Sequence, residues 1–321
     1  MPDEIKNCSD EEFINLCFAD DSGKKGHKFW DNFNNEKTLN INVWEKSCPK
    51  IYNYSKSYDS LPDPDVNSRS LYEAFKRFWN CQYRHLVNEM STLKEVDTEQ
   101  NKCELVVKNE DIVLGSDSIM SIYWHRTSGK MPNVMAKIKE CIENAEMHEE
   151  FCPKEETNYR AFIRNYLKKS NAIGGFIVFP RHYCSINQMR GMSEKIQDRF
   201  DLTLECIRQA YENNDFNGLF YGNPLFDPFG CDAKFFSMFG SFKNYVDFFC
   251  LNSWVTKDYS AVYDLMSKSG NGIIKEWPEE ILPCDFKEEK QQVAQWWTFY
   301  NNIMSRLEAR NEQVRQLLTK P

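Results

Sequence analysis

Apolar residues recur at the spacing of one helix face in three stretches of the chain. In residues 68–90 the face is formed by Leu71, Phe75, Phe78, Trp79, Leu86 and Met90. In residues 157–169 it is formed by Tyr159, Phe162, Ile163, Tyr166 and Leu167. The longest stripe lies in residues 287–318 and contains Val293, Trp296, Trp297, Tyr300, Ile303, Leu307, Val314 and Leu317. The pattern predicts a chain built mostly of helices.

Shorter apolar runs between these stretches predict extended segments. The run FIVFP, residues 176–180, is apolar throughout and ends at Pro180, which is typical of a short buried strand. Residues 103–125 contain two runs with β-branched residues, punctuated by Gly115 and Asp117. They predict at least one further strand.

Residues 234–255 are rich in phenylalanine and apolar on nearly every side. We expect this segment to form one helix in the middle of the core. Asp247 lies within it, and a carboxylate among phenylalanine rings must be paired or protonated. The arginines of residues 181–208 are candidate partners for it.

Together these elements predict an α+β fold that is mainly α-helical, with a few short strands in one large domain. The turn-forming sequence LPDPD, residues 61–65, marks a domain boundary. We expect residues 1–61 to form a polar arm that packs on the main domain through its aromatic residues. The main domain is predicted to cover residues 62–321 and to end in the long helix.

Composition narrows the classes of function. The chain has 321 residues and a net charge of −8, which argues against a surface that coats nucleic acid. No apolar run is long enough to span a bilayer, and the acidic N-terminus lacks the apolar core of a signal peptide. The 12 cysteines lie singly and form no C-x-x-C pair, so we expect free thiols in a cytoplasmic protein.

The segment 185–211 is predicted to contain an amphipathic helix from about Met192 to Tyr211. On a helical wheel one side, the expected core face, carries Ile196, Phe200, Thr203, Leu204, Ile207 and Tyr211. The opposite side carries Asp198, Asp201, Glu205 and Arg208. Most of this pattern is typical of an ordinary helix with one solvated face.

The carboxylates of this helix form a row of like charge. Asp198 and Asp201 are three residues apart and Asp201 and Glu205 four apart, and such pairs destabilise an isolated helix by about 0.2–0.5 kcal/mol each. We therefore expect cations over the row, and Arg208, Arg181 and Arg190 are candidates. Residues 181–211 hold five Lys and Arg against four Asp and Glu, in contrast to the acidic whole.

These charges are open to three interpretations. They form a structural ion-pair network, or they bind an anionic small molecule or partner in a binding or regulatory module, or their acids hold a metal in an enzyme acting on a phosphate-bearing or nucleic-acid substrate. The candidate ligand-binding residues are Arg181, Asn187, Arg190, Asp198, Asp201, Glu205 and Arg208. No catalytic residue, dedicated metal site or cofactor is indicated, since P-loop and H-E-x-x-H motifs are absent and SKSGNG, residues 267–272, is a loop.

Three pieces of the sequence resemble an uncharacterised bacterial family, a domain of unknown function. They are DPDVNSRSLYEAFKRFW, GSDSI, and the stretch SNAIGGFIVFP, SINQMRG and IQDRFDLTLECIRQAY that continues into FKNYVDFFCLNSWVTKDYSAV. The resemblance covers most of residues 62–265 and implies a single domain. It implies no activity, and it includes the polar segment singled out above.

Overall fold

We describe the fold from a computed structural model of the chain. It describes residues 93–97, 103–107, 112–119, 173–181, 199–216, 231–278 and 290–319, and the single positions Phe75, Phe78, Trp79, Gln82, Ile186, Arg190 and Ile196. The predicted arm over residues 1–61, its boundary with the main domain and the predicted helix over residues 157–169 lie outside these residues.

The described strands form one antiparallel sheet in the order β1-β2-β3-β4. Their bounds are β1, Leu93–Asp97; β2, Cys103–Val107; β3, Ile112–Ser118; and β4, Phe176–Pro180. Strand β4 is buried along its whole length, as its apolar run predicts. Gly115 and Asp117 lie inside β3 and pair with Phe179 and Ile177, so the expectation that they punctuate the strand runs was wrong.

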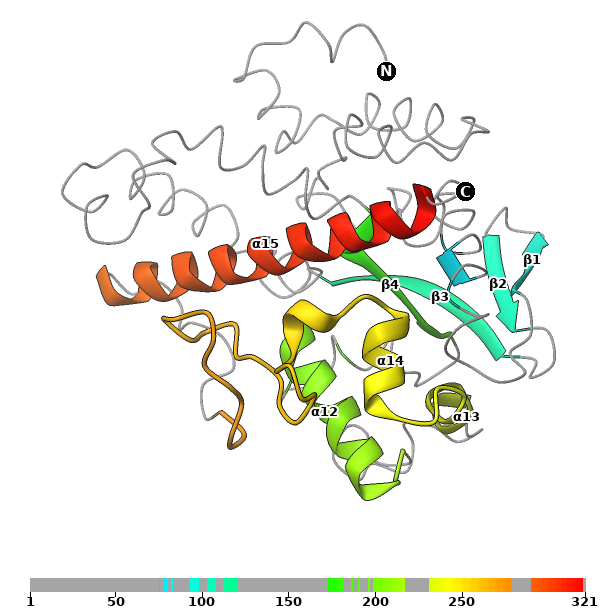
Figure 1. Cartoon of the computed structure of the whole chain (residues 1–321), viewed down its shortest axis with the longest axis horizontal. Helices are drawn as coiled ribbons and strands as arrows, with labels where there is room; N and C mark the ends of the chain where they lie inside the picture. Colours follow the sequence, from blue (N-terminus) through cyan, green and yellow to red (C-terminus); the bar gives the residue numbers. More distant parts are fainter. Residues whose placement is uncertain are drawn as a thin grey trace, which may run out of the picture.

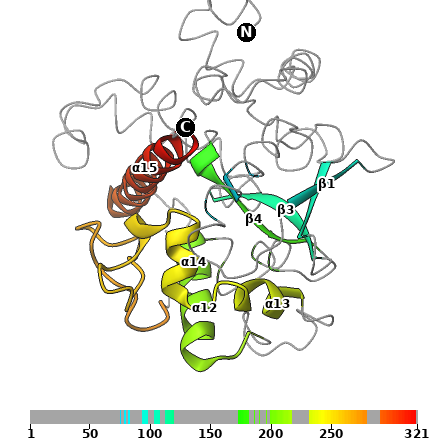
Figure 2. The same cartoon turned by 45° about the vertical axis from the view of Figure 1, so that its right-hand side comes forward.

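Four α-helices accompany the sheet in the described part of the chain. They are α12, Phe200–Asn213; α13, Cys231–Ser237; α14, Phe242–Phe248; and α15, Lys290–Thr319. Helices α12 and α14 lie side by side, and α15 runs past the short helix η2, Ile173–Gly175, at the start of β4 (Figures 1 and 2). Helices and an antiparallel sheet together are compatible with the predicted α+β class.

The aromatic segment does not form the single helix predicted for residues 234–255. It breaks between α13 and α14 at Gly240, whose φ of 69° is left-handed and is readily adopted by glycine. The hydroxyl of Ser241 then caps α14 by accepting a hydrogen bond of 3.2 Å from the backbone N–H of Asn244. A backbone break decided by two residues therefore outweighs the continuous apolar pattern.

Rings from α13, α14 and the segment around Trp79 form an aromatic core. Trp79 lies edge-on to Phe248 with ring centroids 4.9 Å apart, and Phe239 packs against Phe248 and Phe249 at 5.0 and 5.5 Å. Edge-to-face contacts of this kind are favourable because the rings' positive edges meet negative faces. The prediction that this segment lies in the core is confirmed, and Phe75, Phe78 and Trp79 are helical and buried as expected.

Helix α15 buries one stripe along its length. Tyr300, Ile303, Leu307 and Val314 of the predicted stripe are each at most 1 % exposed. The predicted helix over residues 287–318 agrees with the observed one, Lys290–Thr319, within three residues at its start. Of the helices in the described part of the chain, none is both long and apolar enough to cross a membrane.

Candidate functional site

The polar residues of the 181–211 segment meet the sheet through Arg190. This side chain is completely buried, and its Nε donates to the hydroxyl of Thr203 at 3.0 Å. Its Nη1 forms an ion pair with Asp117 of β3. The guanidinium carbon lies 5.6 Å from the ring centre of Phe179 and 5.5 Å from that of Phe200, so two aromatic faces add to its stabilisation.

Arg181 lies against the same face of β3 as Asp117. A Cβ atom added at Gly115 would meet the Cδ of Arg181 at 2.9 Å, which means that the arginine stem occupies the space where a side chain would stand. Gly115 and Asp117 are two residues apart on one strand, so their Cβ directions point to one face of the sheet. The two arginines, one half-buried and one buried, thus lie against one sheet face.

The carboxylate of Asp201 is bound by Arg199 and by the backbone. Arg199 donates to Asp201 through Nε at 3.0 Å and through Nη2, and Nη2 also reaches Asp264 at 2.8 Å. The N–H of Leu265 donates to the same carboxylate of Asp201 at 2.9 Å. Burial alone would lower the pKa of Arg199, but the two carboxylates outweigh it and raise the pKa, so this guanidinium stays charged.

Glu205 is held within its own helix. Arg208 donates to it through Nε and Nη2, both at 2.8 Å, and Gln209 adds a third bond of 2.8 Å. The pairing of Arg208 with Glu205 agrees with their three-residue spacing. The hydrogen bonds that Arg208 donates to Glu205 raise the pKa of the Arg208 guanidinium. Its Nη1 also donates to the exposed Glu212 at 3.0 Å.

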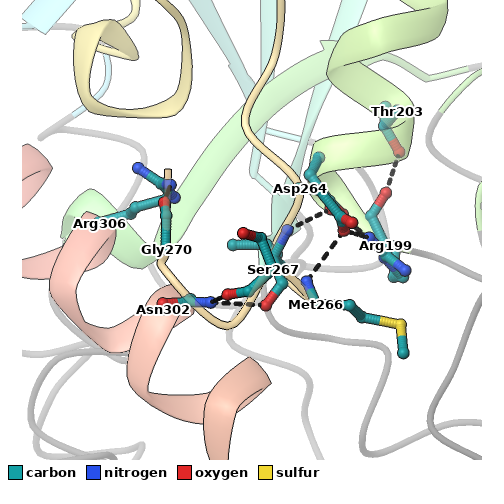
Figure 3. A network of polar contacts seen from close by, with 10 residues as sticks. Arg199, Thr203, Asp264, Met266, Ser267, Gly270, Asn302 and Arg306 are labelled. Atoms are coloured by element: carbon teal, nitrogen blue, oxygen red, sulfur yellow. Dashed lines mark hydrogen bonds and ion pairs between the residues drawn. The ribbon is translucent and has the colours of Figure 1, made fainter. Parts of the chain in front are cut away.

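The loop 264–272 is tied to α15 as well as to α12 (Figure 3). Asn302 donates to the carbonyls of Leu265 and Ser267 at 2.8 and 2.9 Å. Arg306 donates to the carbonyls of Ser253 and Gly270, and its guanidinium lies 4.7 Å from the ring centre of Tyr263. The sequence SKSGNG is therefore an ordered, multiply anchored loop.

Helix α15 also sends a buried arginine into the core. Arg310 is 1 % exposed, and it donates to the carbonyl of Phe249 at 2.9 Å and to those of Gly174 and Phe176 at 2.5 Å. Burial lowers the pKa of Arg310 to about 10. Its charge faces the C-terminal end of α14, where a helix dipole favours a cation.

The structure agrees with only one of the two faces predicted for α12, the apolar core face. Phe200, Leu204 and Ile207 are fully buried, as the helical wheel predicts. Asp201 and Glu205 are also buried, at 0 % and 2 % exposure, so the opposite face is not the solvated face of an ordinary amphipathic helix. Burial is tolerated because arginines pair with both carboxylates. The predicted site residues Asn187 and Asp198 lie outside the described residues.

Asp247 is paired, as expected, although its partners are not the arginines of the 181–208 segment. Its carboxylate accepts hydrogen bonds from Asn252 at 2.6 Å, from the Tyr259 hydroxyl at 2.7 Å and from Lys243. Burial alone would raise the pKa of Asp247, but these three donors outweigh burial and hold the pKa below its ordinary value.

Within the described residues, no group of three or more His, Cys, Asp or Glu side chains is placed to hold a metal ion. Asp201 and Glu205, two of the three acids proposed as metal ligands, are engaged by arginines and neighbouring donors. The metal-dependent enzyme stays a prediction that no observation in this part of the chain supports.

Sequence reasoning missed several members of this polar network, namely Asp117, Arg199, Asp264, Arg306 and Arg310. Two of them carried a signal, since Arg306 and Arg310 stand three residues after the buried Ile303 and Leu307, within the apolar stripe of α15. No sequence pattern pointed to the pairing of Arg199 with Asp264, because the two residues are 65 positions apart and meet only in the folded chain.

The fold and the network define a helix-and-sheet protein whose polar centre is a set of buried arginines paired with carboxylates and backbone carbonyls. The chain belongs to a family described as a family of unknown function (DUF6994), whose model matches residues 49–314. The resemblance to a domain of unknown function is thereby confirmed. No curated protein and no solved structure matches the chain.

Proposed function

We propose that the protein is a binding module that holds an anionic ligand at the β3–β4 sheet face beside Arg181 and Arg190. The proposal is carried by one observation: two arginine side chains, the buried Arg190 and the half-buried Arg181, lie against one sheet face. Neighbouring guanidinium groups suit an anion with oxygen acceptors, because they donate charge-assisted hydrogen bonds to it.

The two arginines have different parts in this proposal. Arg190 is buried and ion-paired, so it fixes the charge and shape of the face. Arg181 is half-buried and directly follows the end of β4, and in this proposal its guanidinium contacts the ligand. Asp201, Glu205 and Arg208 contribute through the ion pairs that hold α12 in place.

Thermal unfolding with added inorganic phosphate at constant ionic strength tests the proposal. A ligand that binds only the native state raises its midpoint with concentration, so the native chain should show a phosphate-dependent rise. The Arg181→Gln variant should lose this rise, while Arg208→Gln, which removes an arginine already paired with Glu205, should keep it. Equal rises in the native chain and in Arg181→Gln would refute the site.

The predicted cytoplasmic location belongs to the same proposal. Cys206 and Cys250 are both buried free thiols, as expected of a chain in a reducing compartment.

The main domain proposed for residues 62–321 overlaps most of the family match, which begins at residue 49. Bacterial origin stays a prediction from the resemblance.

A further inference from the structure

A series of polar contacts, joined at Arg199 by that residue's own backbone and side-chain stem, leads from the sheet face to the loop 264–272. Asp117 pairs with Arg190, whose Nε donates to the Thr203 hydroxyl at 3.0 Å. That hydroxyl donates in turn to the carbonyl of Arg199 at 2.9 Å, and the guanidinium of Arg199 reaches Asp264 at 2.8 Å. Figure 3 shows the end of this chain, from Thr203 through Arg199 to Asp264.

At the loop, two carboxylates hold consecutive backbone N–H groups. Leu265 donates to Asp201 at 2.9 Å, and Met266 donates to Asp264 at 2.9 Å. Both carboxylates are bound by the one guanidinium of Arg199. A shift of Arg199 therefore acts on both anchors of the loop at once, while Lys268, Ser269 and Asn271 are exposed beyond them.

Thr203 links the sheet half and the loop half of this series of polar contacts. Its hydroxyl has one proton, which it donates to Arg199, and it accepts the proton of Arg190 Nε. Hydrogen bonds in series polarise one another in a buried environment, so each strengthens the next. The carbonyl of Arg199 also accepts the backbone N–H of Thr203 at 3.0 Å, which sets this link in the first turn of α12.

We infer that this series of polar contacts couples the β3–β4 sheet face to the loop 264–272. The state of the Arg190–Asp117 ion pair then sets how tightly the loop is held. Ligand binding at the sheet face would then change how tightly the loop is held, which gives the loop a regulatory role. Only the ligand in this inference rests on the proposed function. The coupling between the two regions belongs to the protein without any ligand.

Native-state hydrogen exchange of backbone amides tests the coupling with a matched pair of variants. Thr203→Val keeps the size of the side chain but removes the hydroxyl, and Thr203→Ser keeps the hydroxyl. The amides of Leu265 and Met266 should exchange at least about fivefold faster in Thr203→Val, the lower range of measured couplings between sites. In Thr203→Ser they should exchange as in the native chain.

The amide of Leu251 serves as the reference for general loosening, because it donates to Val246 at 2.9 Å outside the chain of contacts. Its exchange should change less than that of Leu265 and Met266. The inference would be overturned if Leu265 and Met266 exchanged at the same rate in Thr203→Val as in Thr203→Ser. It would also be overturned if Leu251 were accelerated in Thr203→Val as much as the two loop amides.

The reverse experiment covers the case in which Thr203→Val does not fold. Coupling is reciprocal, so Asp264→Asn should accelerate exchange of the Thr203 amide relative to that of Leu251. An unchanged Thr203 amide overturns the inference. Addition of inorganic phosphate separates the two proposals: phosphate binding without an effect on the loop amides overturns the regulatory role of the loop, while coupling without phosphate binding contradicts only the proposed function.

Discussion

At the scale of single residues, two tyrosines on neighbouring helices, Tyr211 half-buried and Tyr245 buried, differ in one hydrogen bond. Tyr211 donates its hydroxyl to the carbonyl of Phe236 at 2.5 Å. The hydroxyl of Tyr245 is completely buried and has no hydrogen-bond partner among the described residues. Burial raises the pKa of both phenols, so both stay protonated at neutral pH.

We predict opposite effects of removing these two hydroxyl groups. Tyr245→Phe should leave the free energy of unfolding unchanged or raise it by up to about 1 kcal/mol, because an unsatisfied buried hydroxyl costs free energy. Tyr211→Phe should lower it by about 1 kcal/mol, the net value of a typical hydrogen bond. Denaturant unfolding measures both, and a loss above 1 kcal/mol in Tyr245→Phe would disagree with the structure.

Asp247 predicts a dependence of stability on pH. Its pKa in the folded chain lies below the ordinary value of 3.8, so the ionised carboxyl favours the folded state. This contribution is fully present above pH 3.8 and is lost as the pH falls through the lower, folded pKa.

Unfolding of the native chain and of Asp247→Asn should therefore be compared across this range. The native chain should be more stable by up to about 1 kcal/mol near neutral pH, a limit set by the partial exposure of the group. The difference should shrink below pH 3.8. A difference that does not vary with pH would show that the three donors do not stabilise the ionised carboxyl.

At the scale of elements, the ends of α14 are set by local chemistry. Ser241 caps its start, and the chain turns at its end through Cys250 with a left-handed φ of 54°. There the N–H of Cys250 donates to Asp247 and that of Leu251 to Val246, which satisfies carbonyls that the helix leaves open. A helix of seven residues depends strongly on such ends.

We expect Ser241→Ala to cost about 1 kcal/mol in unfolding free energy, the typical loss of a helix N-cap. Ser241→Asp keeps an oxygen acceptor at the same position and should restore most of that stability. Denaturant unfolding of the two variants makes the comparison. Equal losses in both would mean that the side chain does not act as a cap.

Elements differed in how far the sequence predicted them. Strand β4 is apolar at every position and helix α15 has a long, regular apolar stripe, and both were found at the expected residues. The division of residues 234–255 into α13 and α14 was missed, because it depends on Gly240 and Ser241 and leaves the apolar pattern unbroken. A glycine with a left-handed backbone and an N-cap serine decide the backbone path there, while hydrophobic periodicity reports only burial.

At the scale of the whole molecule, buried charges join segments that are distant along the chain. Arg190 connects α12 to the sheet, Arg199 connects α12 to the loop 264–272, and Arg310 connects α15 to α14 and β4. Their positions were visible in the sequence but their partners were not. Asp201 meets the N–H of Leu265 across 64 residues, a contact that no local pattern encodes.

The free energy of unfolding of Asp201→Asn tests most directly whether these charges hold the fold together. Asp201 is fully buried, and its loss removes one of the two carboxylates bound by Arg199 in the described part of the chain, so we predict a destabilisation of about 3 kcal/mol, the lower range for breaking a buried ion pair. Glu212→Gln, an exposed member of the same helix, should change stability by less than about 0.5 kcal/mol. If Asp201→Asn also stayed within about 0.5 kcal/mol of the native chain, the buried charges of α12 would not hold the fold together.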